Sequence, residues 1–462
     1  MTDRVHLRRL RFSLIQDTPV WLRTLLPISL LLINAALASM VSQRRLMLLP
    51  YLILGVGAVL IFLRWPPLGL IVALLAGAVV PFFGPSGLNI TMILVSLLLG
   101  LWLLDMVVRQ RQIRFAASRS VWPLLSFLII ALFSFGVGQL PWFNFAQNAP
   151  LGAQLGGLSI IVLSAGTFLL VANQVHDLGW LSRITWAFLA LAALFVVFTS
   201  VLPALGLSTR EFFQPMGSVF YIWLVAMAFS QAAFNRDLHP GWRLALGGLV
   251  LAIFYVRLYI NFDDKSGWIP LLVCIAAITG FRSWRAGLVL VLVAALSAFY
   301  LSTSVISSEE YSLSTRLEAW SILFQIIKIN PIWGTGFANY YWYTPLFPIE
   351  GYAVSFNSHN NYVDIVAQTG LVGLACFLLF LWEVGRLGWR LRDNVPSGFA
   401  QAYVYGALGG LVGMVVVGMF GDWVLPFFYN VGLTGFRSSM LGWLFLGGLV
   451  SLEQMKISPR SG

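Results

Sequence analysis

The sequence has few charged residues. Asp, Glu, Lys and Arg make up 10% of its 462 residues, whereas hydrophobic residues make up 59%. A soluble domain carries about 25% charged residues, so this composition excludes a soluble globular protein and indicates one that is solvated by lipid. The alternating ten-residue segments of a membrane β-barrel are missing too, so we predict an all-α, polytopic integral membrane protein.

Apolar segments predict about 12–14 transmembrane helices. We expect one membrane domain, 1–462, because no internal repeat or low-complexity segment is found. The spans are expected near 22–41, 47–63, 67–83, 87–108, 121–139, 155–173, 184–205, 216–234, 242–260, 266–281, 286–302, 361–385, 400–420 and 436–452. The basic N-terminus ahead of the first span is similar to a signal peptide, but we expect that span to be retained because many more follow.

Basic residues orient these spans, because cytoplasmic loops of membrane proteins collect Lys and Arg. One loop is strongly basic and is therefore placed in the cytoplasm: Arg109, Arg111, Arg114 and Arg119. Alternation then places residues 303–360 outside, as one large extracytoplasmic loop. The same rule accounts for the net charge of +11, which in a soluble protein would suggest nucleic acid; we expect no nucleic-acid partner. Arg44-Arg45 is an exception, since the count places this pair outside.

Cysteine and histidine are scarce. Cys274 and Cys376 fall within apolar segments, so we interpret them as small core residues and not as a disulfide framework. Three of the four histidines are predicted on the cytoplasmic side: His6, His176 and His239. Only His359 faces outward, and neither face gathers the His, Cys and carboxylate groups of a zinc site.

The outward loop contains an amphipathic helix. Its apolar residues recur every three or four positions: Leu313, Leu317, Trp320, Phe324 and Ile327. Such a helix is suited to lie along the bilayer interface. Asn330-Pro331 is expected to end it, and Gly334 and Gly336 to let the chain turn.

His359 is the first candidate for chemistry. Ser358 or Asn357 can cap the following span, which would place His359 in its first helical turn. A helix N-terminus disfavours an imidazolium, so we expect a neutral ring that can accept the proton of an attacking sugar hydroxyl. The alternative is a polar interfacial residue that only caps or packs.

Arg316 lies one turn before Trp320. Its guanidinium can reach headgroup depth and hold a diphosphate with two hydrogen bonds. The alternative is contact with lipid phosphate or an ion pair with a nearby acid: Glu309, Glu310 or Glu318.

Two further outward cations are candidate diphosphate ligands. Lys265 could add a second cation, and Arg210 a third unless it pairs with Glu211. Asp263-Asp264 could instead bind a divalent metal that bridges a phosphate, or form a solvated turn.

Aromatic residues crowd the loop between 337 and 356. Tyr340, Tyr341 and Trp342, together with Asn360, are weak candidates for contacts with a glycan. Trp and Tyr also gather at any membrane interface, and this alternative stays open.

Ten residues in order carry a family resemblance: Arg316, Trp320, Pro331, Gly334, Gly336, His359, Asn360, Tyr362, Gly370 and Gly373. The order is Arg, a Trp one turn later, Pro-x-x-Gly-x-Gly, His-Asn-x-Tyr, and Gly-x-x-Gly inside the next helix. This pattern resembles the O-antigen ligase and O-antigen polymerase superfamily of bacterial polytopic membrane glycosyltransferases.

The resemblance implies a glycosyltransferase of the bacterial cytoplasmic (inner) membrane, with its active site on the extracytoplasmic face. The donor would be an undecaprenyl-diphosphate-linked glycan, and the acceptor lipid A core or a second lipid-linked glycan. It also implies that His359 assists the acceptor hydroxyl, that Arg316 stabilises the diphosphate, and that no cofactor or metal is needed.

The chain departs from the family at two places. Many relatives carry Ser-Arg-Gly before the span that here begins near Ser266, and this chain has Asp264-Lys265-Ser266-Gly267 there. Lys265 could replace that arginine, but it would bind phosphate as a point charge. Gln368 stands where a glutamate is common. Two alternatives to a ligase or polymerase stay open: a transporter or flippase of a lipid-linked saccharide, and a protein O-oligosaccharyltransferase relative.

Overall fold

The computed structural model describes residues 12–13, 49–82, 84, 87–204, 206, 212–260, 264–349 and 351–455. For 12–13, 49–54, 204, 260, 265 and 293–314 only the backbone is described. The α-helices are α2 (Leu49–Arg64), α3 (Pro66–Val79), α4 (Ile90–Leu104), α5 (Val121–Val137), α6 (Leu151–Gln174), α7 (Leu178–Val196), α8 (Leu202–Ala204), α9 (Ser218–Phe234), α10 (Pro240–Tyr255), α11 (Lys265–Arg282), α12 (Trp284–Ile327), α13 (Asn339–Tyr343), α14 (Asn361–Leu391), α15 (Phe399–Phe420) and α16 (Phe436–Gln454).

Strand and non-α helices make only short segments of the described chain. The π-helical turns are η3 (Asp105–Arg109), η4 (Val197–Val201) and η5 (Val256–Ile260), and the 3-10 turns are η6 (Thr344–Leu346) and η7 (Leu433–Gly435). The strands β1 (Phe12–Ser13) and β2 (Gln112–Ile113) pair antiparallel. The all-α prediction is confirmed.

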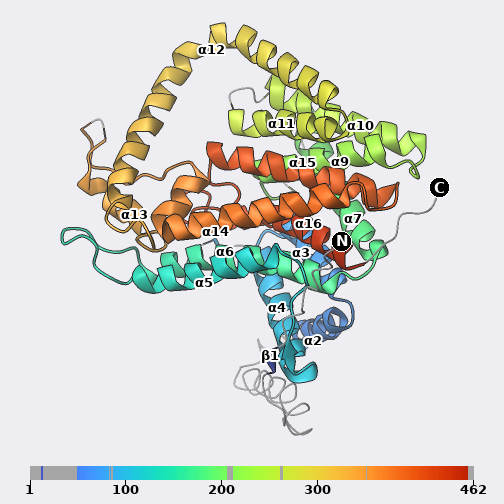
Figure 1. Ribbon diagram of the computed structural model, residues 1–462, viewed down its shortest axis with the longest axis horizontal. Helices are drawn as coiled ribbons and strands as arrows, with labels where there is room; N and C mark the ends of the chain where they lie inside the picture. The colour runs from blue at the N-terminus through green and yellow to red at the C-terminus, as the bar shows by residue number, and fades with distance from the viewer. Residues whose placement is uncertain are drawn as a thin grey trace, which may run out of the picture.

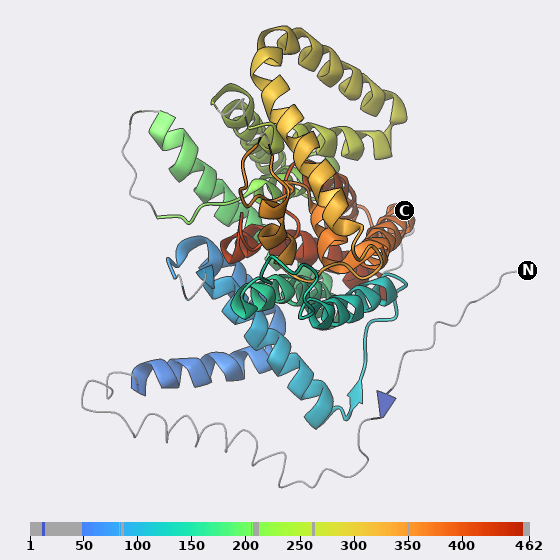
Figure 2. The same ribbon diagram turned by 90° about the vertical axis from the view of Figure 1, so that its left-hand side faces the viewer.

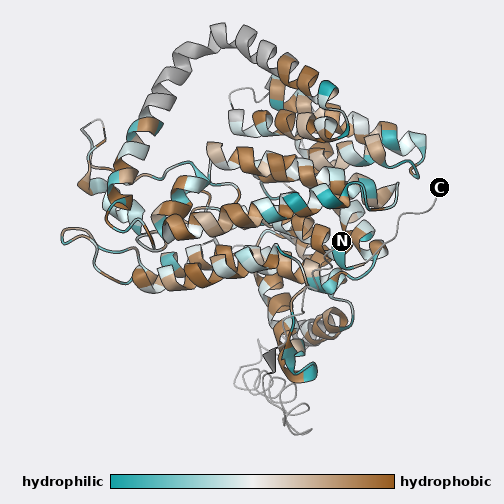
Figure 3. Ribbon diagram, viewed as in Figure 1, coloured by the Kyte–Doolittle hydropathy of each residue, from teal (hydrophilic) through white to brown (hydrophobic). Residues whose placement is uncertain are grey.

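The helices coincide with the predicted membrane spans. Each span from 47–63 to 436–452 matches a helix or part of one, whereas 22–41 and Arg44-Arg45 lie outside the described residues. Within the described chain, six helices are long and apolar enough to cross a membrane: Ile90–Arg109, Leu151–Gln174, Leu178–Val201, Pro240–Tyr259, Asn361–Leu391 and Phe399–Phe420. Apolar residues prevail along these helices in Figure 3. The protein is therefore a multi-pass membrane protein.

The centre of the bundle is formed by α6, α9, α15 and α16. Trp223 of α9 and Trp443 of α16 are fully buried there. The helices α5, α6, α14 and α15 run side by side (Figure 1), and α14 packs against both α5 and α15. This packing fixes the start of α14, which directly follows His359 and Asn360 of the predicted site.

One long helix replaces two predicted elements. The span expected at 286–302 and the amphipathic helix after it form the single helix α12 (Trp284–Ile327). The sequence holds no Gly or Pro from 288 to 330, so nothing interrupts the backbone hydrogen bonds. Figure 2 shows α12 leaving the bundle and returning, so that its last turns reach α13 and α14.

The end of α12 differs from the predicted apolar stripe. Leu317 and Phe324 are more than half exposed, whereas Leu323 and Ile326 are fully buried. The helix is apolar on both sides here, because one side packs on α13 and α14 and the other faces outward from the bundle. A position flat on the bilayer is therefore not needed to explain its hydrophobic residues.

The helix α14 is broken at Gly370, where φ is 70° and ψ is −177°. The loop Pro331–Gly336 fits into the break: Thr335 N–H donates to Ala367 O (2.9 Å) and Leu371 N–H donates to Pro331 O (2.8 Å). Gly334 and Gly336 also have positive φ, as the predicted turn requires. A side chain at Gly370 would collide with the backbone of Ile332, so the glycines of the motif serve this junction.

Candidate active site

Asn360 is the N-terminal cap of α14, and His359 is the residue before this cap. Asn360 Oδ1 accepts hydrogen bonds from the backbone N–H groups of Tyr362 (2.9 Å) and Val363 (3.3 Å). The predictions that Ser358 or Asn357 caps the helix, and that His359 lies in its first turn, are therefore wrong. His359 has a left-handed φ of 47° and an exposed side chain. An extended cap residue separates it from the helix, which leaves the ring free to face the site.

A buried hydrogen-bond cluster holds the residue before His359. Ser358 Oγ accepts from Asn360 N–H (2.9 Å) and lies 2.6 Å from Asp364 Oδ1. Tyr340 Oη also donates to Asp364 Oδ1, at 2.5 Å. Ser358, Asp364 and Tyr340 are each at most 1% exposed. This cluster joins α13 to α14 and fixes the backbone on which His359 stands.

Arg316 approaches the same place from α12. Trp320 Nε1–H donates to Ser358 O over 2.8 Å, which ties α12 to the residue beside His359. Arg316 lies four positions earlier and therefore on the same side of α12 as Trp320. Its charge acts on His359, so the structure brings together the two residues to which the sequence assigned chemistry. The side chains of Glu309 and Glu310, proposed as alternative partners of Arg316, lie outside the described residues.

Two residues that the sequence analysis missed complete the surroundings of His359. Asp422 follows α15 and is 1% exposed. Its Oδ2 accepts from Phe427 N–H (2.8 Å), and its Oδ1 accepts from Asn430 Nδ2 (2.6 Å). Asn430 Nδ2 in turn lies 3.5 Å from His359 Nδ1. The available signal was an acid and an amide in the otherwise largely apolar connection between α15 and α16, at the same end of the bundle as His359.

Burial and charge act on the His359 ring in opposite directions. Partial burial lowers the pKa of His359 from its ordinary value, and the Arg316 guanidinium lowers it further, whereas Asp422 raises it. The net shift is downward, so the neutral ring is favoured near pH 7. The expected direction is correct, although its main cause is burial and not the helix terminus.

The predicted glycan contacts divide into two groups. Tyr340 is fully buried, stacks on Phe427 at 4.8 Å and donates to Asp364, so it offers no face to a sugar. Asn360 is committed to the cap of α14. Tyr341 and Trp342 instead pack on Tyr429: Tyr341 stacks at 4.6 Å, and Trp342 Nε1–H donates to its hydroxyl at 2.8 Å.

The structure does not test the diphosphate-binding roles predicted for Lys265 and Arg210, and it describes only one residue of the Asp263-Asp264 pair. Arg210 and Asp263 lie outside the described residues, and only the backbone of Lys265, at the start of α11, is described. Asp264 pairs with Arg257 of η5 at 3.0 Å. Arg257 is 9% exposed and lies over the Tyr221 ring at 3.8 Å.

No group of three or more His, Cys, Asp or Glu side chains that could hold a metal occurs among the described residues. Asp264, half of the proposed metal-binding pair, already neutralises an arginine. The expectation that the reaction needs no metal stays a prediction.

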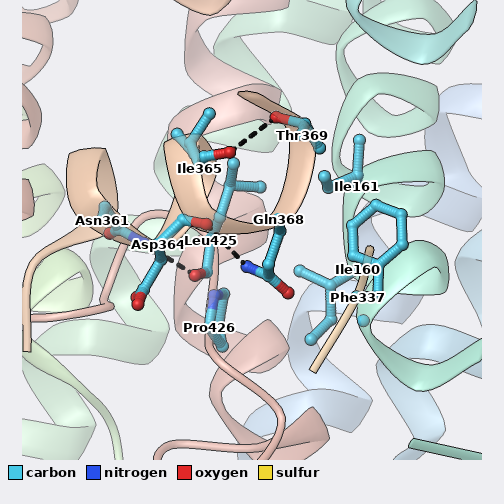
Figure 4. A pocket seen from close by; sticks show the side chains of 11 residues that line it. Ile160, Ile161, Phe337, Asn361, Asp364, Ile365, Gln368, Thr369, Leu425 and Pro426 are labelled. Carbon is cyan, nitrogen blue, oxygen red and sulfur yellow. Dashed lines mark hydrogen bonds between the residues drawn. The ribbon is translucent and has the colours of Figure 1, made fainter. Parts of the chain in front are cut away.

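A small cavity lies behind the site, between α6, α14 and the segment after α15 (Figure 4). Its volume is about 20 Å³, and Asp364 and Gln368 contribute polar groups to its wall. A single water needs about 10–15 Å³, so the cavity is too small for a substrate. Gln368 Oε1 accepts from Ala338 N–H and its Nε2 donates to Asp364 O, both at 3.2 Å. A glutamate here could not donate the second bond, which gives a physical reason for the departure at Gln368.

Comparison with known families identifies the region that contains this site. Residues 241–378 match the family model of O-antigen ligase. The matched range contains Arg316, the glycine loop, His359 and the break in α14, so the resemblance carried by the sequence motif is confirmed. No curated protein matches the chain.

Proposed function

We propose that this multi-pass membrane protein, which carries an O-antigen ligase domain, transfers an undecaprenyl-diphosphate-linked glycan to a lipid-linked acceptor. The family match and the helical membrane fold support a ligase-like membrane glycosyltransferase. One observation supports the assignment of this activity to Arg316 and His359. The Trp320–Ser358 hydrogen bond brings the helix of Arg316 to the segment of His359, just before the start of α14.

The reaction needs one proton acceptor and one anion stabiliser. The acceptor hydroxyl gives its proton to neutral His359 as its oxygen bonds to the anomeric carbon of the donor sugar. The bond from that carbon to the diphosphate oxygen breaks, and the diphosphate leaves with the electron pair. The Arg316 guanidinium stabilises the charge that develops on the diphosphate. Lys265 and Arg210 are further candidate ligands of the same anion.

The acceptor is either lipid A core, as in a ligase, or a second lipid-linked glycan, as in a polymerase. Tyr341 and Trp342 would contact the glycan, because their rings are not fully buried and pack on Tyr429, the residue before Asn430. The site is placed on the extracytoplasmic face of the inner membrane, in the segment 303–360, since this orientation puts most basic loops in the cytoplasm. No cofactor or nucleic acid enters the proposal.

The test is transfer from a purified undecaprenyl-diphosphate oligosaccharide in detergent. Wild type and His359→Ala are compared, each with lipid A core and with donor alone. We expect product from wild type and at least a hundredfold loss in the variant, about the lower bound of what a positioned base contributes. Product that needs lipid A core means a ligase, and a ladder from donor alone means a polymerase.

Near-wild-type transfer by a folded His359→Ala would overturn the assignment of the base. If folded wild type gives no product with either acceptor, lipid-linked saccharide transport in vesicles and glycan transfer to protein test the two alternatives. Activity that survives excess EDTA would exclude the Asp263-Asp264 metal hypothesis, whereas loss restored by Mg²⁺ or Mn²⁺ would support it.

A further inference from the structure

The amide of Asn430 lies between a buried carboxylate and the candidate base. Its Nδ2 is 2.6 Å from Asp422 Oδ1 and 3.5 Å from His359 Nδ1. An amide nitrogen carries two hydrogens, so one can point to each partner. The longer contact is in the range at which catalytic hydrogen bonds are found before substrate binds.

The turn that carries Asn430 is fixed independently of His359. Phe427 O accepts from the N–H groups of Asn430 (3.2 Å) and Gly432 (2.9 Å), and Asp422 Oδ2 accepts from Phe427 N–H. Asp422 thus holds both ends of a short turn from a buried position. The amide is aimed at the His359 ring from a rigid support.

The orientation of the amide depends on the charge of Asp422. If the amide turned over, its Oδ1 would face Asp422 Oδ1, and two acceptor oxygens would meet without a proton between them. An ionised Asp422 therefore keeps Nδ2 toward itself and toward His359 Nδ1. Nδ1 must then act as an acceptor, so the proton of the neutral ring lies on Nε2.

We propose that Asn430 is a positioning residue that determines which ring nitrogen of His359 carries the proton, and that the ionisation of Asp422 controls it. With Asp422 ionised, His359 presents Nε2–H and is a hydrogen-bond donor to the substrate. With Asp422 protonated, the amide turns over and its Oδ1 accepts from Nδ1–H. Nε2 has then lost its proton to solvent while Nδ1 has gained one, and Nε2 becomes the base.

This catalytic consequence rests on the proposed function, whereas the tautomer of the ring does not. The charged groups that act on His359 are Arg316 from α12 and Asp422 from the segment after α15. Asp422 interacts in turn with Asp364 on α14 and Tyr340 in α13. Burial raises the pKa of Asp422, which moves its protonation toward the working pH range.

The direct test is ¹⁵N NMR of the full-length protein in detergent micelles, with ¹⁵N-labelled histidine and with His359 assigned from the spectrum of His359→Gln. At a pH where the ring is neutral and Asp422 ionised, we expect Nε2 protonated and Nδ1 unprotonated. Asn430→Ala should give a mixture of the two tautomers. Asn394→Ala is the matched control, because its amide donates to Arg390 O (2.5 Å) at a different site.

A wild-type ring that carries its proton on Nδ1 would overturn the inference, and this spectrum needs no variant. An unchanged tautomer in Asn430→Ala would overturn it as well. If the tautomer is as expected but wild type transfers no glycan, the proposed function fails and the inference on the tautomer stands.

The kinetic test is the pH dependence of transfer. In wild type the rate should fall at low pH as His359 is protonated and at high pH as Asp422 loses its proton. Asp422→Asn should remove the alkaline decline, because a neutral amide at 422 can face either end of Asn430. Asn430→Ala should lower kcat about tenfold with little change in KM, as part of the 10²–10⁴-fold that a positioned base contributes. An alkaline decline that persists unchanged in Asp422→Asn would contradict control by this carboxylate.

Discussion

Two buried carboxylates lie near His359, and their roles in the site differ. Asp364 and Asp422 are each 1% exposed. Asp364 binds the hydroxyl groups of Tyr340 and Ser358, and its Oδ2 has no hydrogen-bond partner among the described residues. Asp422 binds a backbone N–H and the Asn430 amide, and its charge acts on His359.

The difference shows that burial of an acid does not by itself mark a catalytic group. Asp364 connects α13 to the start of α14 through neutral donors, so its main effect is on the fold of the site. Asp422 reaches the reacting ring through one amide, so its main effect is on protonation. The comparison predicts that substitutions at the two acids separate into loss of stability and change of pH dependence.

The largest expected effect is that of Asp364→Ala. Two buried hydroxyl groups lose an acceptor, at about 1–3 kcal/mol each, so the free energy of unfolding should fall by about 2–6 kcal/mol. Thermal unfolding in detergent measures this, with Asp364→Asn as the control that keeps an acceptor oxygen. An unchanged midpoint for the alanine variant would remove the structural role of Asp364.

Next in size is Arg316, whose charge acts on His359 in the opposite direction to that of Asp422. Arg316→Gln should lower transfer about 10–100-fold, since a hydrogen bond to a charged group contributes about 1.5–3 kcal/mol. It should also raise the pKa of His359, so the acid limb of the pH profile moves to higher pH. Arg316→Lys should keep that limb in place while losing the paired hydrogen bonds. Full activity of either variant would remove the diphosphate role.

Asp422→Asn should have a smaller effect on rate, about tenfold or less near neutral pH, because the ring itself is retained. Within the proposed switch Asp422 is already protonated at the acid limb, so the substitution removes no charge there and that limb should stay in place. Profiles recorded for this variant and Arg316→Gln should therefore differ: the first loses the alkaline decline, and the second shifts its acid limb to higher pH. An acid limb that moves as far in Asp422→Asn as in Arg316→Gln would contradict this arrangement.

The smallest expected effect is that of Tyr340→Phe. It removes one of the two donors to Asp364 but keeps the ring that stacks on Phe427, so we expect about 1 kcal/mol of destabilisation. The pH profile of transfer should stay that of wild type. A shifted profile would mean that Asp364, like Asp422, is coupled to the protonation of His359.

Hydropathy was enough to predict the helices, because each described span is a long apolar run. It could not reveal the break in α14, since Gly370 is one glycine inside such a run and its conformation depends on the loop from Pro331. The 286–302 span and the amphipathic helix form one helix because no Gly or Pro separates them. This lack of helix breakers is visible in the sequence.

The site residues that belong to the sequence motif were predicted. Those that only the fold brings near His359 were missed. Arg316 and His359 were found, and the Trp320–Ser358 bond explains why the tryptophan accompanies them. Asp422 and Asn430 are more than sixty positions beyond His359 and show no periodicity. Tyr340 was given a sugar-binding role because sequence does not show that its ring is buried.

The break in α14 also bears on the depth of the site in the bilayer. After the break the apolar run ends before Glu383, so Leu371–Trp382 covers about 18 Å at 1.5 Å per residue. The hydrocarbon layer is about 30 Å thick, so a membrane-spanning α14 also needs the turns before the break, Asn361–Thr369. The break at Gly370 then falls inside the span, where the loop Pro331–Gly336 supplies hydrogen bonds to the interrupted backbone. Under the proposed function, His359 would stand at the end of this span, at the membrane surface.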